Sequence, residues 1–551
     1  MSNIDIFTIF RTKGLDVLFG SCYFRCMIPK VRSFLLQGID AQVVEIEVDL
    51  DETQLQKEVV VGLPDAAVRE SIERVRSAMC NSGYPMPIGR TLINLAPADI
   101  RKEGPMYDLP IAVGVLVSNG VIHPARQTAL VGAPAGGGIS FDDESTGLDP
   151  RRALIAGELA LDGRIRPIRG VIAMVSLAKS MGLDAVVVPS ENAAEASVVD
   201  GVRVFGVSSL SQVVGLMNGS LDLEPCASTD VESMLEETLA SIDFSEIKGQ
   251  ESVKRALVIA AAGQHNIVML GPAGTGKTMM AKALPGIMPA LTPTQAIEVT
   301  RVYSSRGMLD SSSGLVSSRP VRTPHHTASS PAIVGGGAIP QAGEISLAHH
   351  GILFLDELPE FSRNVLETMR QPMEDHVVTI ARSHGTVQFP ASFMLVAAMN
   401  PTPRGDVAPG EVGRREMERY LSRLSGPLLD RIDLHVEAPA VPWIELSKKA
   451  TGTDTATMRE SVANARARSN KRQGEVPNSR LKGRELDSIM ALDDGAKTLL
   501  EQAMTQLGLS ARAYDKIRRV ALTIADIGGC DSVKAEHIGE AVQYRLLDRK
   551  L

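Results

Sequence analysis

The sequence predicts an α/β protein, and three observations support that prediction. Short apolar strands alternate with amphipathic helices between about residues 31 and 214. A second stretch, residues 243–442, repeats this pattern and contains a strand that runs through a glycine-rich loop into a helix. The remainder, residues 443–551, is mostly helical by period and composition. We therefore expect two α/β units followed by a helical one.

Composition places the chain among globular proteins and excludes some classes. Of its 551 residues, 44% are hydrophobic and 22% charged, with a formal net charge of -8. An acidic chain gives no general argument for nucleic-acid binding, although a local basic channel is compatible with it. No apolar run reaches the ~18 residues of a membrane helix. The five cysteines are scattered, as expected in a reducing cytoplasm, and are Cys22, Cys26, Cys80, Cys226 and Cys530.

The first unit is expected over residues 28–218, after an atypical extension of residues 1–27. Charges interrupt that extension, unlike a signal peptide, and Met27 is a candidate start. Strands are expected at residues 41–50, 58–64, 91–97, 153–161, 185–190 and 202–207, and helices at 66–84 and 171–183. Residues 132–150 are expected to form an exposed loop. Residues 219–242 are acidic and polar and are expected to form a linker.

The second unit contains the most specific short motif of the chain, which follows an apolar strand at residues 267–270. It matches GxxxxGK[ST] throughout and reads Gly271, Pro272, Ala273, Gly274, Thr275, Gly276, Lys277 and Thr278. Glycines let backbone N–H groups turn toward phosphates, and a helix follows at once. Lys277 is expected to reach the β and γ phosphates, and Thr278 to offer its hydroxyl to Mg²⁺. We therefore expect ATP and Mg²⁺ as ligands.

Two later strands end in polar residues that would complete this site. The apolar strand 352–355 is followed by Asp356 and Glu357, 78 residues after Thr278. Asp356 is expected to hold Mg²⁺, and Glu357 to polarise the attacking water. A third strand ends in Asn400, whose amide could position that water. The Asp-Glu pair is common by itself and gains weight from the phosphate loop before it.

These three elements together resemble an AAA+ ATPase. The segment LLDRIDLHV places Arg431 where such proteins carry an arginine finger, which reaches the γ-phosphate of a neighbouring subunit. Arg512 begins a helix and resembles the sensor 2 arginine of the lid. Either arginine could instead make a surface ion pair, and Arg518 and Arg519 lie near Arg512. The expected catalytic residues are thus Glu357, Asn400, Arg431 and Arg512.

Two longer segments, residues 321–361 and 423–439, resemble magnesium-chelatase-like proteins of the ComM (YifB) type. The likeness runs from about Val31 to the C-terminus. It implies an AAA+ core with a parallel sheet at residues 243–442, and a helical lid and C-terminal domain at 443–551. It further implies a cytoplasmic homo-hexamer that acts on single-stranded, double-stranded or branched DNA in its pore. The implied activity is that of a branch-migration helicase supporting recombination in natural transformation.

The same resemblance assigns elements that would face the pore. Residues 335–345 fit a helix-2 insertion, and residues 377–390 fit the pre-sensor 1 hairpin. A ring would bring Arg382 and His384 of that hairpin around a phosphate backbone, although a solvated hairpin without a ligand is the alternative. Residues 459–484 hold eight Lys/Arg and could touch DNA, but a solvated helix and loop is the preferred interpretation.

The first unit resembles the proteolytic domain of Lon, through RKEGPMYDLP at residues 101–110 and through residues 160–192. At the positions of the Lon serine and lysine the chain has Met106 and Ile172. A thioether and a sec-butyl group can neither attack a carbonyl nor accept a proton. The resemblance therefore implies an α+β Lon-protease-like domain without its catalytic dyad, so that the chain is not a protease.

Neither haem nor zinc is expected. Six of the ten histidines lie between His325 and His384, but adjacent histidines on a strand would point to opposite faces. The segment after Asn400 lacks the cysteines that many relatives carry there. Two alternatives remain to the DNA motor. One is a chelatase-type motor that drives metal insertion with partner subunits, although the chain lacks an integrin-like DxSxS module. The other is a chaperone-like remodeller.

Overall fold

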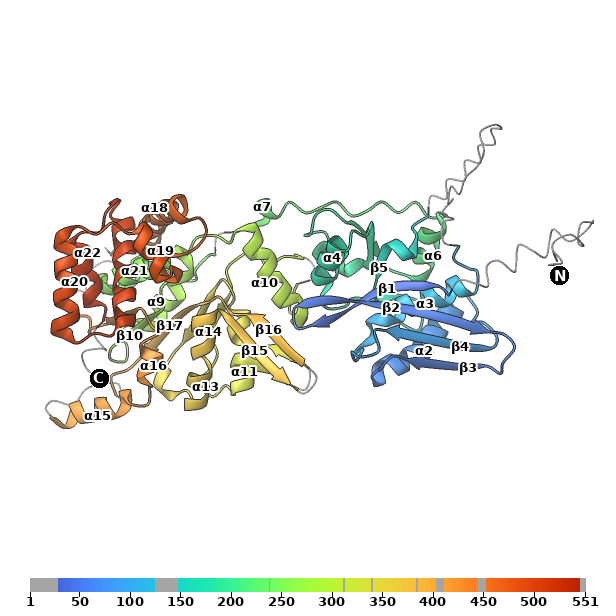
Figure 1. Cartoon of the computed structure of the whole chain (residues 1–551), viewed down its shortest axis with the longest axis horizontal. Helices are drawn as coiled ribbons and strands as arrows, with labels where there is room; N and C mark the ends of the chain where they lie inside the picture. The colour runs from blue at the N-terminus through green and yellow to red at the C-terminus, as the bar shows by residue number, and fades with distance from the viewer. Residues whose placement is uncertain are drawn as a thin grey trace, which may run out of the picture. The chain divides into compact units, whose positions relative to one another are not determined.

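The computed structural model describes residues 28–123, 147–236, 238–310, 313–337, 340–382, 385–402, 411–442 and 452–545. The chain forms two compact units (Figure 1). Unit 1 runs to Thr229 and includes Asp310–Gly314, and unit 2 holds the rest. The junction after Thr229 falls inside the segment predicted as a linker, where the structure has a short helix, α7 (Val231–Met234). Most of the loop predicted at residues 132–150 lies outside the described residues.

Unit 1 is built on a seven-stranded mixed sheet with the order β3-β4-β2-β1-β5-β8-β9. The contacts among β1, β2 and β4 are antiparallel, and the remaining pairs in the sheet are parallel. The strands are β1 (Lys30–Gln37), β2 (Asp40–Asp51), β3 (Lys57–Val61), β4 (Arg90–Ala96), β5 (Ala153–Ile155), β8 (Ala185–Pro189) and β9 (Arg203–Val207). The predicted strand at residues 153–161 is divided, because β6 (Glu158–Leu159) pairs instead with β7 (Ile165–Arg166).

Four main helices accompany this sheet: α2 (Ala66–Asn81), α3 (Asp108–Ser118), α4 (Val171–Ser180) and α6 (Leu210–Asn218). Helix α2 begins where the side chain of Asp65 accepts a hydrogen bond from the backbone N–H of Val68. Helix α3 and strand β1 were not predicted. Residues Asp108–Leu116 of α3 are all buried, so the helix shows no alternation of apolar and polar faces by which its period could be recognised.

Unit 2 contains a five-stranded, fully parallel sheet with the order β11-β14-β17-β10-β18. The strands are β11 (Val321–Arg322), β14 (Ile352–Leu355), β17 (Met394–Met399), β10 (Ile267–Leu270) and β18 (Leu434–Glu437). All residues of β14 and β17 are buried, as expected for strands covered on both faces. Because β14, β17 and β10 are parallel neighbours, the residues after each strand meet at one edge of the sheet.

Helices surround this sheet and continue into a C-terminal group (Figure 1). Helices α8 (Glu251–Gly263), α9 (Lys277–Ala283), α10 (Pro293–Arg306) and α14 (Arg370–Asp375) belong to the core. Strands β15 (Val377–Arg382) and β16 (Gly385–Pro390) form a projecting hairpin at the position predicted for one. The C-terminal group includes α18 (Thr455–Gln473), α20 (Asp494–Leu507), α21 (Ala511–Ile527) and α22 (Ala535–Gln543). None of the helices described is long and apolar enough to cross a membrane.

Candidate functional site

The glycine-rich loop joins β10 to α9 in a conformation that depends on its glycines. Gly274 and Gly276 have φ of 77° and 85°, in the left-handed region that other residues rarely adopt. At Gly271 a Cβ would lie 2.1 Å from the carbonyl oxygen of Ala438. The loop therefore needs glycine at these positions, and its backbone is shaped to enclose an anion such as phosphate.

Lys277 lies inside this loop rather than in solvent. Its Nζ donates hydrogen bonds to the carbonyl oxygens of Gly271 (2.8 Å) and Pro272 (2.7 Å), and to Oδ1 of Asn400 (3.1 Å). The residue is 7% exposed, and burial lowers the pKa of its ammonium group. A phosphate in the loop would supply the negative charge that this buried cation lacks. Lys277 and Asn400 were both predicted for this site, and the structure places them in contact.

The donors expected for Mg²⁺ also come together. The hydroxyl of Thr278 donates to Oδ2 of Asp356 at 2.8 Å. A hydroxyl and a carboxylate, both oxygen donors, suit a hard cation that keeps several waters and binds substrate phosphates. These residues fit an ATP–Mg²⁺ complex, with Thr278 and Asp356 on the cation and residues 271–278 around the phosphates.

Glu357 follows Asp356 in an unusual backbone conformation. Its φ is 52°, which for a non-glycine residue is uncommon and clusters at functional sites. The backbone N–H of Glu357 donates to Oδ1 of Asp356 (3.0 Å), and the side chain is 52% exposed. Its Oε2 lies 3.3 Å from Nδ1 of His326. Nothing in the sequence pattern predicts that His326 pairs with Glu357, beyond the cluster of histidines to which His326 belongs.

Arg431 and Arg512 lie close to one another and share an ion-pair partner, Glu374, which was not among the predicted site residues. Nη2 of Arg431 is 2.6 Å from Oε1 of Glu374, and Nη2 of Arg512 is 4.0 Å from the same oxygen. Arg512 also pairs with Asp430 at 3.4 Å. Within the described residues, neither arginine makes a hydrogen bond or ion pair with the glycine-rich loop of its own chain. Their partners are Glu374 and Asp430, and Arg431 also donates to the carbonyl oxygen of Pro427 at 2.6 Å.

The histidine pairs contradict the expectation that adjacent rings point to opposite faces. Nε2 of His349 and Nε2 of His350 lie 3.2 and 2.7 Å from Oε2 of Glu298. The pair is in a turn, not a strand, and His350 has a φ of 53°. The three side chains are close enough to share one ion. However, the N–H of Ser392 donates to Nδ1 of His349 (3.0 Å), so Nε2 carries the proton and donates to Glu298. This pattern favours a hydrogen-bonded cluster.

The basic run at residues 459–484 is more enclosed than a solvated helix. Arg472 pairs with the buried Asp526 through both nitrogens, at 2.7 and 2.9 Å. Arg459 donates to the carbonyl oxygen of Gly286 (2.7 Å), and Arg466 is only 9% exposed. These arginines hold α18 in place, so their charge is not free to meet a nucleic acid. The side chains of Arg382 and His384 lie outside the described residues.

In unit 1, the two positions compared with the Lon dyad are apolar in structure as well as in sequence. Ile172 is fully buried at the start of α4, and its backbone N–H donates to Oε1 of Glu195 (2.9 Å). Met106 packs against the clusters on both sides of the sheet. Lys102 is also buried, with its ammonium on the carbonyl oxygen of Ile100 at 2.8 Å. At these positions the side chains thus contribute to the packing of unit 1.

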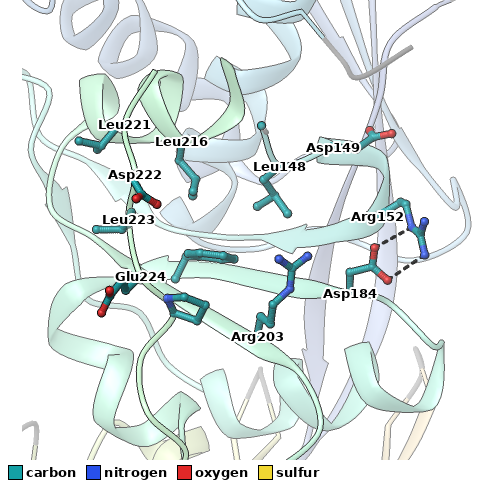
Figure 2. Close-up of a pocket in the computed structure, with 13 residues that line it drawn as sticks. Leu148, Asp149, Arg152, Asp184, Arg203, Leu216, Leu221, Asp222, Leu223 and Glu224 are labelled. Atoms are coloured by element: carbon teal, nitrogen blue, oxygen red, sulfur yellow. Dashed lines mark hydrogen bonds and ion pairs between the residues drawn. The ribbon is translucent and has the colours of Figure 1, made fainter. Parts of the chain in front are cut away.

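Unit 1 also contains a cavity of about 440 Å³, apart from the residues discussed so far (Figure 2). Arg152 pairs with Asp184 on one side at 2.8 Å, and Arg203 points between that pair and the leucines. Asp222 and Glu224 add negative charge to the lining. The mixture of signs offers no consistent attraction for a phosphate, so the glycine-rich loop of unit 2 is the better nucleotide site.

Three magnesium-chelatase family descriptions match most of the chain. The family described as "Magnesium chelatase, subunit ChlI" matches residues 243–446, and "Magnesium chelatase, subunit ChlI C-terminal" matches residues 452–545. "Subunit ChlI of Mg-chelatase" matches residues 46–138 and 134–192.

Relatives match over nearly the whole chain. "Competence protein ComM" of Haemophilus influenzae is 40% identical over 520 residues, covering 93% of this chain and 96% of the relative. YifB of Salmonella typhimurium is 41% identical over 518 residues, with the same shares. The magnesium-chelatase 67 kDa subunit of Chlorobaculum parvum is 25% identical over 313 residues, covering 56% of this chain and 44% of the relative. With its nucleotide loop and parallel sheet, the chain belongs to the ComM (YifB) family of magnesium-chelatase-like AAA+ proteins.

Proposed function

We propose that this protein is a cytoplasmic, hexameric ATP hydrolase that uses ATP to act on DNA as a branch-migration helicase. The observation that carries the ATPase part is the convergence at one sheet edge of Lys277, Asn400, Thr278 and Asp356. The DNA part is supported by the relative named competence protein ComM. Natural transformation brings in DNA that must be recombined, which gives a branched substrate for such an enzyme.

In this proposal the chain's own residues divide the work between binding and hydrolysis. Lys277 exchanges its carbonyl and amide contacts for phosphate oxygens, and Thr278 and Asp356 hold the cation. Bound Mg²⁺ supplies positive charge to the phosphate oxygens. Glu357 orients and polarises the attacking water, and Asn400 holds that water by its amide. The exposure of Glu357 gives water access to its carboxylate.

Arg431 is proposed to complete the site of a neighbouring subunit. Its guanidinium forms an ion pair with Glu374. An arginine finger supplied by a second chain raises the rate of phosphoryl transfer by about 10³–10⁵-fold. Arg512, which lies beside it, would face the same neighbour. Arg431→Ala should therefore abolish turnover while leaving the binding of ATP to the subunit nearly unchanged.

A mixing experiment tests that shared site. Arg431→Ala chains have an intact loop, and Lys277→Ala chains have an intact finger. Each variant alone should be inactive. Mixing them should restore part of the ATPase rate, at interfaces where the loop of an Arg431→Ala chain meets the finger of a Lys277→Ala chain. Full turnover by Arg431→Ala alone would show that the finger assignment is wrong.

The DNA part needs a test of its own. A labelled four-way junction is incubated with the protein and ATP, and the separated duplex arms are measured on a native gel. We expect separation with ATP and none with Lys277→Ala or with a non-hydrolysable analogue. ATP turnover without any junction separation would count against a branch-migration helicase.

A chelatase-type motor is the second candidate, because the matching family descriptions name magnesium chelatase. The chelatase relative cited above is 25% identical and covers about half of this chain, which makes the ComM-type assignment stronger. A chelatase role predicts that ATP turnover responds to partner subunits and a porphyrin, whereas the DNA role predicts a response to DNA alone.

A further inference from the structure

The proposed finger, Arg431, is bracketed by two aspartates that both bind the same C-terminal helix. Asp430 pairs with Arg512 at 3.4 Å, and Oδ1 of Asp433 lies 3.0 Å from Nζ of Lys516. Arg512 and Lys516 are one turn apart on α21, so they lie on the same face of that helix. The segment carrying Arg431 is therefore fixed to α21 on both sides of the arginine.

The two ion pairs are not equivalent. Arg512 is 63% exposed, and exposed pairs contribute little because solvent screens them. Asp433 and Lys516 are 6% and 9% exposed, and breaking a buried pair leaves an uncompensated charge away from water. Of the two pairs, Asp433–Lys516 is therefore the one whose disruption would cost more.

Asp433 is also tied to the strand that leads into the nucleotide loop. Its Oδ2 accepts a hydrogen bond from the backbone N–H of Asn266 (3.0 Å), directly before β10. Its own backbone N–H donates to the carbonyl oxygen of Asn266 (3.0 Å). A single carboxylate therefore contacts α21 through one oxygen and the start of β10 through the other.

A second set of polar contacts, made by His265, also connects Asp433 to α21. His265 lies 3.6 Å from Asp433 through Nδ1, and its Nε2 is 2.8 Å from Oγ1 of Thr523 on α21. Between Asp433 and Arg431 only Ile432 intervenes. Ile432 is fully buried, and its carbonyl oxygen accepts a hydrogen bond from Arg545 (2.7 Å). No flexible linker separates the anchored carboxylate from the finger.

We propose that Lys516 and Asp433 are positioning residues for Arg431, through which the orientation of the C-terminal helix α21 sets the place of the finger. The inference rests on the proposed ATPase function and adds to it a physical connection between the C-terminal helices and the finger. When α21 shifts against the core, the buried ion pair carries Asp433 and the neighbouring Arg431 with it. A displacement of about 1 Å at a catalytic group can lower a rate by ~10²-fold.

The test is a double-mutant cycle on the full-length protein, with kcat for ATP hydrolysis and Kd for ATP as readouts. Lys516→Met removes the charge and keeps most of the volume. We expect it to lower kcat by roughly 10- to 100-fold with Kd changed by less than about twofold. The second arm of the cycle is Arg431→Lys, which keeps a cation and leaves residual turnover to measure. In that background Lys516→Met should lower kcat much less than in the wild-type chain, because Lys516 acts through Arg431.

Three further variants keep the test sharp. Lys516→Arg, which retains the charge, should recover most of the activity. Asp433→Asn keeps the size of the side chain and serves if Lys516→Met does not fold, as judged by thermal unfolding. Lys497→Met removes an exposed lysine from the Asp494 pair on α20 and should leave kcat unchanged.

The outcomes separate this inference from the proposed function. Full turnover of the folded Lys516→Met and Asp433→Asn variants, in a protein that Arg431→Ala inactivates, overturns the inference and leaves the ATPase proposal standing. Equal fold losses from Lys516→Met in the wild-type and Arg431→Lys backgrounds also overturn it, since they indicate a general structural role. A wild-type chain that binds ATP but does not hydrolyse it would overturn the proposed function and the inference together.

Discussion

The two units of the molecule differ in the side chains that lie at the ends of their strands and helices. In unit 2, polar side chains follow three adjacent parallel strands, and Lys277, Asn400 and Asp356 converge there. In unit 1, the positions compared with a catalytic dyad hold Met106, which is half-buried against the core, and Ile172, which is fully buried. Chemistry requires convergent polar groups, and only the first of these two places has them. The difference is between a place that brings polar groups together and a place that packs apolar side chains.

The largest effect is expected from a substitution of Lys277, because its ammonium group is the cation inside the glycine-rich loop. Lys277→Ala removes the ammonium group that fills the loop, and should weaken ATP binding by about tenfold to a hundredfold or more, since charge-assisted hydrogen bonds to phosphate are lost. Fluorescent-nucleotide titration measures this. Lys282→Ala, on an exposed position of the same helix, is the matched control and should bind normally. Unchanged binding by Lys277→Ala would mean that the loop is not the nucleotide site.

Glu357→Gln should separate binding from hydrolysis within unit 2. The amide cannot polarise water as the carboxylate does, so we expect kcat to fall by about 10²–10⁴-fold while ATP still binds. Steady-state phosphate release and nucleotide titration on the same preparation check both parts. Glu360→Gln, three residues further along and exposed, is the control. If Glu360→Gln lost turnover and Glu357→Gln did not, the assignment of the base would be reversed.

Unit 1 should respond to substitution in stability and not in chemistry. Ile172→Ala leaves a cavity in the core and should lower the free energy of unfolding of unit 1 by about 2–5 kcal/mol. Denaturant titration, followed by a spectroscopic signal that reports on unit 1, measures this change. ATP turnover per folded molecule should not change. Ile88→Ala, at a position 84% exposed, should be neutral in both assays. Peptidase activity in the wild-type chain would remove the contrast between the two units.

The smallest effect is expected at Glu374, which holds Arg431 and Arg512 in the single chain. This carboxylate is 46% exposed, so its ion pair with the finger is weak and competes only modestly with a neighbour's phosphate. Glu374→Gln should therefore raise ATP turnover at low protein concentration by about twofold. Glu367→Gln, which removes a separate ion pair with Arg370 at the start of α14, provides the control. A decrease of tenfold would indicate that Glu374 positions the arginine instead of restraining it.

Much of the nucleotide site could be predicted from the sequence because its residues sit at strand ends. Buried parallel strands are short apolar runs, so β10, β14 and β17 were recognisable and their next residues could be assigned. The partners of Arg431 and Glu357 could not be assigned in this way. Glu374 and His326 are brought to them by tertiary packing, and nothing in the local pattern of either residue marks that contact.

The same limit applies to elements and side chains that depend on context. Helix α3 was missed because it is buried on all sides and has no polar face. The His349–His350 pair was expected on a strand, where its rings would diverge, but a turn brings both rings to Glu298. The basic run was expected in solvent, yet Arg472 finds a buried partner 54 residues away in Asp526. For the histidine pair and the basic run, the partner that decides the position of the side chains is distant in sequence.

The most direct measurement of the central claim is the steady-state ATPase rate of the purified full-length protein with and without a branched DNA. The account predicts a clear rise in rate with the branched DNA in the wild-type chain, and a rate about 10²–10⁴-fold lower in Glu357→Gln under either condition. A rate that does not change with DNA, in a protein that binds ATP and assembles, would contradict the DNA motor. It would leave unit 2 as an ATPase whose substrate must be sought among proteins or porphyrins.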